Sequence, residues 1–296
     1  MNLNEENRDG YLISAEMKKI WAVEMEIARH ILDVCKRHGL KIWAEGGTLL
    51  GVVRHHGFIP WDDDIDFMMM RDDYEKLIKL ADSEFKHPFF LQCAQTEKNY
   101  FRGHIQVRYD GTAAILPDDI NQTFHQGIFV DIFVYDNVPE QKSRKWKRSL
   151  RNAKWSLKCL QTAYYKSFNI KKPFTTVKYI ISKTLCLLFG SMNIFNFFVK
   201  QFTKWNQTES KYISSTFYPK FIEENTKEKK WYDGTVMMPF EDMDIPVPIH
   251  YHEILSCKFG KDYMTPRKVS TLHGGVIVYT DKSYETVLAE LRNQKR

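Results

Sequence analysis

Residues 43–67 read WAEGGTLLGVVRHHGFIPWDDDIDF, and this stretch decides the fold and the chemistry expected of the chain. It places a glycine turn, Gly46–Thr48, shortly before a run of aspartates. If residues 64–67 are extended, the two-residue period of a strand puts Asp64 and Asp66 on one face. Two like charges about 4 Å apart repel by roughly 4 kcal/mol at an effective dielectric near 20. The pair therefore needs a proton, a basic partner or a cation.

A divalent cation and a phosphate together would satisfy both motifs. Carboxylate oxygens suit Mg2+, with Mn2+ as the alternative ion, and Mg2+ keeps coordination positions open for phosphate oxygens. Glycines let backbone N–H groups approach an anion, and the N-terminus of a following helix favours negative charge. Either motif alone is also typical of a solvated turn. Their combination in this order favours a metal and phosphate site.

A third carboxylate, Asp131, lies in the segment GIFVDIF at residues 127–133. The surrounding Phe, Val and Ile residues have the composition of a buried strand. A carboxylate in such a strand needs a partner, because the burial of an isolated charge is costly. We therefore expect Asp131 to join Asp64 and Asp66.

This order of motifs resembles the nucleotidyltransferase superfold, in which a glycine turn precedes an Asp-x-Asp strand and a later strand supplies a third carboxylate. The chain more closely resembles the LicD-type family of phosphocholine transferases, whose signature looks like GGTLLGAVRH, then GFIPWDDDID, then an arginine before Asp-Tyr. Residues 46–74 read GGTLLGVVRHHGFIPWDDDIDFMMMRDDY. Residues 259–266, FGKDYMTP, are similar to a family pattern of Tyr-Gly-Asp-Tyr-Met followed by proline, with Lys261 inserted. The resemblance covers most of residues 10–275 and is weakest in the basic middle.

The resemblance implies transfer of phosphocholine, or a related phospho-alcohol, from a CDP-linked donor such as CDP-choline to a hydroxyl of a glycan. The implied acceptor is a cell-surface glycan or its lipid-linked precursor, of the lipopolysaccharide or teichoic-acid type. The predicted metal ligands and catalytic residues are Asp64, Asp66 and Asp131. Asp131 is either a ligand of a second metal or the general base. The predicted phosphate-binding residues are Gly46, Gly47 and Thr48.

Three arginines and one further aspartate complete the predicted site. Arg54 follows Thr48 by six residues, past a short helix, and is expected to contact the phosphate that carries charge in the transition state. The alternative for Arg54 is an ordinary surface position. Arg71 and Arg108 are candidate phosphate contacts, with a structural ion pair as the alternative for each. Asp63 is a candidate substrate-binding residue that orients the loop, with a plain turn residue as the alternative.

The order of the predicted elements indicates an α/β architecture, a nucleotidyltransferase-like mixed sheet flanked by helices with an added basic helical region. Residues 1–140 form the predicted catalytic core, residues 141–208 a basic amphipathic helical insertion, and residues 209–296 a segment that packs back on the core. Proline-rich alternation over residues 232–267 predicts short strands and ordered loops rather than a helix. The predicted strands are 41–44, 64–70, 89–93, 104–109 and 128–135. The predicted helices of the core are 11–38, 48–53 and 72–84.

Positive charge is concentrated in the middle of the chain. Residues 141–208 contain fifteen Lys or Arg and no Asp or Glu, so the rest of the chain has a net charge of −9 against +6 overall. Basic amphipathic helices bind anionic membrane surfaces. The alternative is an accessory helical domain whose apolar stripes pack on the core and whose lysines face water. One such stripe consists of Val177, Ile180, Ile181, Leu185 and Leu188.

Two other functions are compatible with these features. One is a nucleotidyltransferase that releases pyrophosphate, and the other is a non-catalytic binder that attaches to a membrane or polyanion through residues 141–208. A binder has no use for the three carboxylates, and no specific nucleic acid is expected. The polar start MNLNEENRDG lacks the profile of a signal peptide, so the expected location is the cytoplasm, with peripheral attachment to the inner face of the cell membrane. The five cysteines lack C-x-x-C spacing and are expected to be free thiols.

Overall fold

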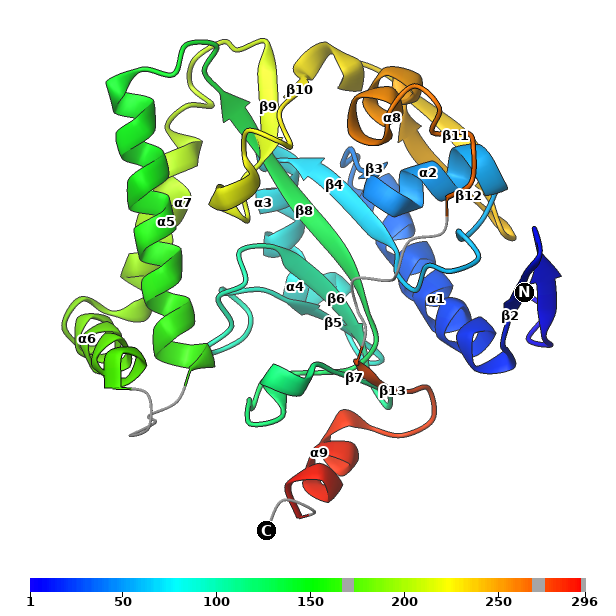
Figure 1. The fold of residues 1–296 in the computed structure, drawn as a ribbon, viewed down its shortest axis with the longest axis horizontal. Helices are drawn as coiled ribbons and strands as arrows, with labels where there is room; N and C mark the ends of the chain where they lie inside the picture. Colours follow the sequence, from blue (N-terminus) through cyan, green and yellow to red (C-terminus); the bar gives the residue numbers. More distant parts are fainter. Residues whose placement is uncertain (167–172, 268–274, 294–296) are drawn as a thin grey trace. The chain divides into compact units, whose positions relative to one another are not determined.

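The computed structural model describes residues 1–166, 173–267 and 275–293, which form two compact units (Figure 1). The first unit comprises residues 1–92, 105–133 and 230–296, and the second comprises residues 93–104 and 134–229. The predicted basic segment, residues 141–208, lies within the second unit. Residues 209–229 belong to that unit as well, whereas the remainder of the C-terminal part belongs to the first.

The first unit is built on a mixed sheet with the strand order β3-β4-β8-β6-β5. The pairs β3–β4, β6–β8 and β5–β6 are antiparallel, whereas the arrows of β4 and β8 point the same way in Figure 1. The prediction of an α/β fold with a mixed sheet flanked by helices is confirmed. The strands are β3 (Trp43–Ala44), β4 (Asp66–Met70), β5 (Phe89–Gln92), β6 (Ile105–Tyr109) and β8 (Phe129–Val138), of which residues 129–133 belong to this unit.

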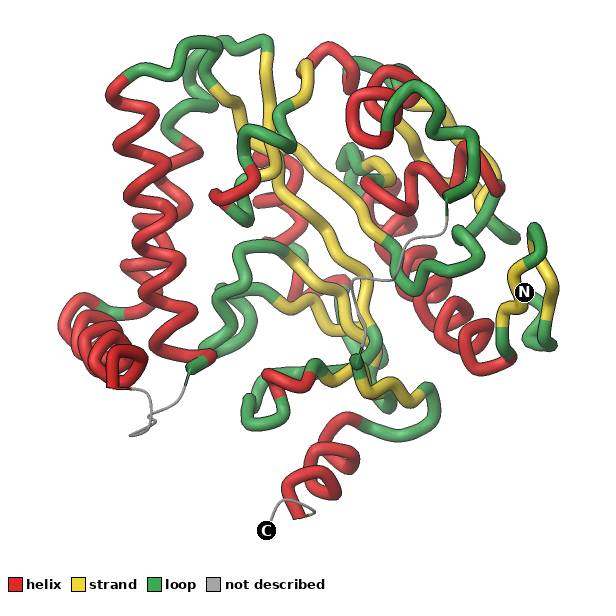
Figure 2. The backbone as a smooth tube through the Cα atoms, viewed as in Figure 1, coloured by secondary structure: helices red, strands yellow, loops and turns green. Residues whose placement is uncertain are grey.

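The long helix α1 (Ala15–Arg37) begins where the Ser14 side chain accepts a hydrogen bond from the Met17 N–H. It lies close to β6, one of the strands drawn in yellow in Figure 2. Its buried face includes Trp21, which stacks on Phe58 with ring centroids 4.4 Å apart. The predicted helix 11–38 is thus confirmed from residue 15, since its first residues form β2 (Tyr11–Ile13) paired with β1 (Glu6–Arg8). The other helices of the early part are α2 (Gly46–His55), α3 (Arg71–Lys79) and α4 (Ala81–Glu84).

The C-terminal part of the first unit contains a hairpin, β11 (Thr235–Phe240) with β12 (Met243–Pro248), followed by a helix. The prediction of strands and loops without a helix is wrong at α8 (Tyr251–Phe259). No proline lies between Pro248 and Pro266. The residues after Pro248 therefore form a helix that buries Ile254 and Leu255 and ends at Gly260, which has φ +91°. The remaining elements of this unit are β7 (Ala113–Ile115), which pairs with β13 (Ile277–Tyr279), the short 3-10 helix η1 (Pro117–Asp119), and α9 (Tyr284–Asn293).

The second unit is a helical bundle beside a small antiparallel sheet. Its sheet consists of residues 134–138 of β8, β9 (Tyr212–Ser215) and β10 (Lys227–Glu228). Its core is formed by apolar side chains such as Trp146, Leu157 and Phe202, which are at most 3% exposed. The helices are α5 (Arg144–Tyr165), α6 (Pro173–Phe189), α7 (Ser191–Thr203) and the 3-10 helix η2 (Pro219–Phe221). A further 3-10 helix, η3 (Lys229–Tyr232), follows β10, and its residues 230–232 belong to the first unit.

Candidate active site

The glycine turn connects β3 to the N-terminus of α2 and lies against acidic side chains. The Glu45 N–H donates to the Asp66 carbonyl oxygen at 3.0 Å, and the helix starts at Gly46 with φ +59°. A Cβ atom at Gly46 would lie 3.5 Å from Asp66 Oδ2, and one at Gly47 would lie 2.6 Å from Asp62 Oδ2. At Gly47 the end of the Asp62 side chain would have to move to admit a Cβ atom. At Gly46 the positive φ is the reason that the turn favours glycine.

Thr48 connects the turn to β4 through its hydroxyl oxygen, which accepts a hydrogen bond from the Asp66 N–H at 2.8 Å. This contact holds the start of β4 against the first turn of α2. The predicted contact of the Thr48 hydroxyl with phosphate stays a prediction.

Asp64, Asp66 and Asp131 lie close enough for their charges to interact. Burial raises the pKa of Asp66 well above its usual value, and the charges of Asp64 and Asp131 raise that pKa further. Asp66 Oδ1 is buried and accepts no hydrogen bond within residues 1–166, 173–267 and 275–293. The Asp131 N–H donates to the Ile65 carbonyl oxygen at 3.2 Å, which joins the two segments. The charges of the three predicted carboxylates therefore act on one another, but the described acidic residues whose oxygens all approach within 4.8 Å are Asp62, Asp63 and Asp64 rather than this trio.

The predicted strand 64–70 begins two residues late, at Asp66. Asp64 therefore precedes β4 rather than alternating with Asp66 within it. The apolar side of the predicted alternation is nevertheless present, since Ile65 and Phe67 are fully buried. Asp64 instead groups with Asp62 and Asp63, because one carboxylate oxygen from each of the three residues lies within 4.8 Å of the others.

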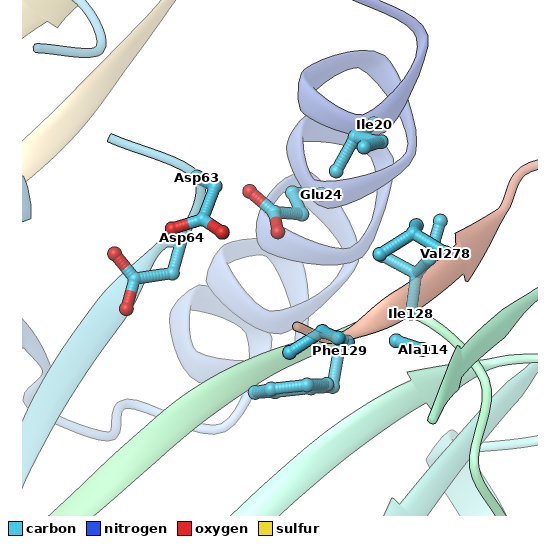
Figure 3. A pocket seen from close by; sticks show the side chains of 9 residues that line it. Ile20, Glu24, Asp63, Asp64, Ala114, Ile128, Phe129 and Val278 are labelled. Carbon is cyan, nitrogen blue, oxygen red and sulfur yellow. The ribbon is translucent and has the colours of Figure 1, made fainter. Parts of the chain in front are cut away.

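Glu24 of α1 faces this aspartate group and was not predicted from the sequence. It lines a small cavity of about 40 Å3 with Ile20, Asp63, Asp64 and Phe129, and Figure 3 shows its carboxyl directed toward Asp63. Burial raises its pKa well above the usual value, and the charges of the nearby aspartates, Asp64 first, raise that pKa further. The only signal in the sequence is an acidic residue on the apolar face of the predicted helix 11–38.

Lys258 of α8 is a second group that sequence reasoning missed. Its Nζ lies 3.4 Å from Glu45 Oε1, and its positive charge lowers the pKa of Asp66 against the larger effects of burial and the aspartates. A Cβ atom at Gly46 would lie 3.3 Å from this Nζ. The neighbouring Cys257 is exposed, unlike the other four cysteines. The sequence signal for Lys258 is its place directly before the FGKDYMTP pattern.

Each of the three predicted arginines contacts other groups of the protein. Arg54 is eight residues beyond Gly46, roughly 12 Å along the helix axis, and its Nη1 donates to the Tyr263 carbonyl oxygen at 2.8 Å. Arg108 is buried, and it donates to Gln92 Oε1 at 2.8 Å and to the Gly127 carbonyl oxygen at 2.7 Å. Arg71 is buried at the start of α3, with its guanidinium 5.6 Å from the Tyr74 ring centroid. Phosphate binding by any of the three stays a prediction.

The fold and the site together define a mixed α/β protein in which a glycine turn at a helix N-terminus faces a group of carboxylates. Residues 39–140 match the family described as LicD/FKTN/FKRP, nucleotidyltransferase domain. The chain therefore carries a LicD-family domain, and the resemblance predicted from the sequence is confirmed.

Curated relatives agree with this assignment. The chain is 28% identical over 257 residues to the lipopolysaccharide cholinephosphotransferase LicD of Haemophilus influenzae (strain ATCC 51907 / DSM 11121 / KW20 / Rd), covering 84% of this chain and 93% of that protein. It is 39% identical over 59 residues to the ribitol 5-phosphate transferase FKRP of Homo sapiens and of Mus musculus, covering 20% of this chain and 12% of each FKRP. The names of these relatives denote transfer of a phosphorylated alcohol.

Proposed function

We propose that this chain is a metal-dependent transferase that moves phosphocholine, or a related phospho-alcohol, from a CDP-linked donor to a hydroxyl of a glycan. The similarity to LicD and FKRP supports the class of reaction. The observation that carries the proposal is the buried Asp66 carboxylate beside the Gly46 turn, whose pKa is raised by burial and by the charges of Asp64 and Asp131. The acceptor in this proposal is a cell-surface glycan precursor of the lipopolysaccharide or teichoic-acid type, handled on the cytoplasmic side of the membrane.

The carboxylates fit a hard divalent cation, Mg2+ or Mn2+. Asp66 Oδ1 is buried without a hydrogen-bond donor from the described part of the chain, and its neighbours are also acidic. Such a group is stabilised by a cation, and oxygen ligands are those that Mg2+ prefers. Asp64, Asp66 and Asp131 would hold the ion, which when bound supplies neutralisation of phosphate charge.

The remaining roles belong to groups of the chain itself. The N–H groups of Gly46 and Gly47 open α2 and offer an anion the positive end of the helix dipole. Lys258 adds a positive charge on the same side of the turn. In this proposal Asp131 either helps to hold the cation or accepts the proton of the acceptor hydroxyl. Positioning of donor and acceptor supplies most of the rate in phosphoryl transfer.

The direct test is to incubate the full chain with CDP-choline, Mg2+ and candidate glycan acceptors and to measure release of CMP. We expect acceptor-dependent release that falls by at least on the order of 100-fold in Asp64→Asn and in Asp66→Asn. The matched control is Asp72→Asn, since Asp72 is an exposed aspartate six residues after Asp66. Equal release from the wild type and the two site variants would exclude the proposed site.

A second candidate is nucleotidyl transfer, which the description of the matched domain favours. In that reaction the nucleotide stays on the acceptor and pyrophosphate leaves. Mass spectrometry of the acceptor separates the two reactions. An added phospho-alcohol supports the first proposal, and an added nucleotide supports the second.

A further inference from the structure

Helix α6 has its polarity reversed relative to a normal surface helix. Its outward face is apolar, with Phe174 and Leu187 each 85% exposed and Leu188 71% exposed. Further exposed apolar residues on this helix are Val177, Ile180, Ile181 and Phe189. The residues that α6 buries are polar or small, namely Thr176, Ser182 and Cys186. Apolar surface that is gathered on one helix in this way marks an interaction site.

The neighbouring helices do not share this arrangement. α5 buries Trp146, Leu157 and Leu160, and α7 buries Phe198 and Phe202. The apolar residues of α5 and α7 thus contribute to the core of the second unit. In the stripe of α6, Val177, Ile180, Ile181 and Leu188 are exposed, whereas Leu185 packs against that core.

Small groups on the inward face explain how α6 can leave its apolar residues outside. Cys159 Sγ of α5 lies 3.9 Å from the Ser182 carbonyl oxygen, and Lys183 Nζ lies 4.3 Å from the ring centroid of Tyr164. The helix thus contacts α5 through the Ser182 carbonyl oxygen and the Lys183 ammonium group. Its large side chains stay available for another surface.

The positive charge of the surrounding segment indicates which kind of partner surface α6 binds. Residues 141–208 contain fifteen Lys or Arg and no Asp or Glu. Lys178 is exposed and lies one helical turn from both Phe174 and Ile181, so a positive charge borders the apolar face. An apolar stripe bordered by lysines fits the boundary between anionic lipid headgroups and acyl chains. A protein partner with an apolar surface would not require the absence of acidic residues over such a length.

The geometry of α6 favours a position in the plane of a bilayer. Among the helices of the described ranges, none alone is long and apolar enough to cross a membrane. α6 and α7 pass that test only as a pair, and the pair is bent by 92°. Since α7 buries most of its large apolar residues in the core, including Phe195, Phe198 and Phe202, α6 is the part that is free to enter a lipid interface.

We propose that α6 is an interfacial anchor that attaches this protein to anionic bilayers. Phe174, Ile181 and Leu188 enter the acyl boundary, and the basic residues of the segment contact phosphate headgroups. This inference does not depend on the proposed transferase activity. If both are correct, the anchor keeps the enzyme at the surface that carries a lipid-linked acceptor.

The test is flotation of the full chain with vesicles of phosphatidylcholine containing phosphatidylglycerol. We expect wild-type protein to float, and we expect Phe174→Ser, Leu187→Ser and Leu188→Ser combined to lower the partition coefficient on the order of tenfold or more. The control combines Leu12→Ser and Met237→Ser, which alter residues of the first unit that are 62% and 56% exposed. Vesicles of phosphatidylcholine alone should bind less protein, and circular dichroism should show that each variant is folded.

Three results would overturn the proposal. One is a wild-type protein that does not float with anionic vesicles. Another is a triple variant that floats as well as the wild type, since binding would then be purely electrostatic. The third is a wild-type dimer in solution that the triple variant converts to a monomer, because a second copy would then cover α6. CMP release with a soluble acceptor should be the same in the wild type and the triple variant, which separates failure of the anchor from failure of the proposed function.

Discussion

At the scale of single residues, Asp66 is a group whose local environment opposes its charge. Its pKa is raised by burial and by Asp64 and Asp131, with only Lys258 acting in the opposite direction among the leading causes. Residues held in this way reduce the stability of the free protein and are found where a ligand compensates. Glu24, beside the aspartate group, is in a similar environment, because burial and the neighbouring aspartates also raise its pKa.

Asp66→Asn should stabilise the cation-free protein while it removes activity. We expect the free energy of unfolding in urea, at neutral pH with a chelator, to rise by about 0.5–2 kcal/mol because repulsion with Asp64 and Asp131 is relieved. Added Mg2+ should stabilise the wild type and leave the variant unchanged. Asp72→Asn serves as the control and should respond to Mg2+ like the wild type. A variant that is less stable and still responds to Mg2+ would contradict the assignment of Asp66.

Glu24 makes stability depend on pH in a defined direction. Its native pKa is raised above the usual 4.5, so the folded state holds the proton more tightly than the unfolded state does. The contribution of protonated Glu24 to the free energy of unfolding is fully present below pH 4.5. It declines as the pH rises through the native pKa of Glu24, by at most about 1.4 kcal/mol per pH unit.

Glu24→Gln should therefore raise the melting temperature more at pH 8 than at pH 5. Thermal unfolding followed by circular dichroism at both pH values measures the difference. Glu16→Gln, which changes an exposed glutamate of the same helix, should have the same small effect at both. An equal shift for Glu24→Gln at the two pH values would exclude the proposed effect of protonation.

At the scale of elements, most of the site was predictable because it is encoded in short stretches. Helical and strand periods located α1, α2, β4 and β8 to within a few residues. The motif in residues 46–74 predicts Asp66 as a site residue, and the apolar segment at residues 127–133 predicts Asp131. Asp64 was placed in a strand that starts only at Asp66, since pairing with β8 and not the aspartate pattern determines where β4 begins.

The contributions missed by sequence reasoning are those that depend on distant segments. Lys258 reaches Gly46 across more than 200 residues of chain, on a helix that was predicted to be loop. Glu24 reaches the aspartates because Trp21, one turn earlier, donates to the Asp62 carbonyl oxygen at 3.1 Å. The periodicity of a single helix or strand contains no information about such contacts between distant segments. The outward apolar face of α6 was equally hidden, because an apolar stripe looks the same whether it faces a core or a membrane.

The glycines of α2 offer a test at this scale. A Cβ atom at Gly51 would lie 2.5 Å from the carbonyl oxygen of Gly57, which is backbone and cannot yield easily. Gly51→Ala should therefore lower the free energy of unfolding by about 1–3 kcal/mol, although alanine normally stabilises a helix interior by about 1 kcal/mol. Chemical denaturation measures whether the free energy of unfolding falls or rises in Gly51→Ala. A stabilised variant would contradict the close contact between residue 51 and the Gly57 carbonyl oxygen.

Gly47→Ala is the matched comparison on the same helix. The new Cβ would lie 2.6 Å from Asp62 Oδ2, the end of a side chain that can move. We expect a small change in stability and a loss of CMP release of at least about tenfold, because the displaced carboxylate belongs to the site. Full activity in the Gly47→Ala variant would show that the glycine turn and the displaced Asp62 carboxylate are not needed for the reaction.

At the scale of the whole molecule, each unit has its own core. The second unit is held by a cluster that includes Trp146, Phe198 and Phe202. The core of the first unit is formed by buried side chains of the sheet and of α1, such as Phe67, Val107 and Trp21. The negative charge lies mainly in the first unit, and the basic segment lies in the second.

Phe202→Ala should destabilise the second unit selectively. Phe202 is fully buried, and removal of a buried phenylalanine ring costs about 3–5 kcal/mol. Hydrogen exchange monitored by mass spectrometry should show faster exchange in α5 and α7 with α1 unchanged. Equal acceleration in α1 would show that the two units unfold together. Phe197→Ala, which removes a ring that is 41% exposed on the same helix, is the control.

The distribution of thiols gives the molecule a ready attachment point for a spectroscopic label. Cys257 is exposed beside Lys258, whereas Cys35, Cys93, Cys159 and Cys186 are buried, and burial raises the pKa of Cys35 to about 12. A maleimide dye should therefore react at Cys257 in the unaltered chain. Its fluorescence would report donor binding next to the glycine turn without any engineered cysteine.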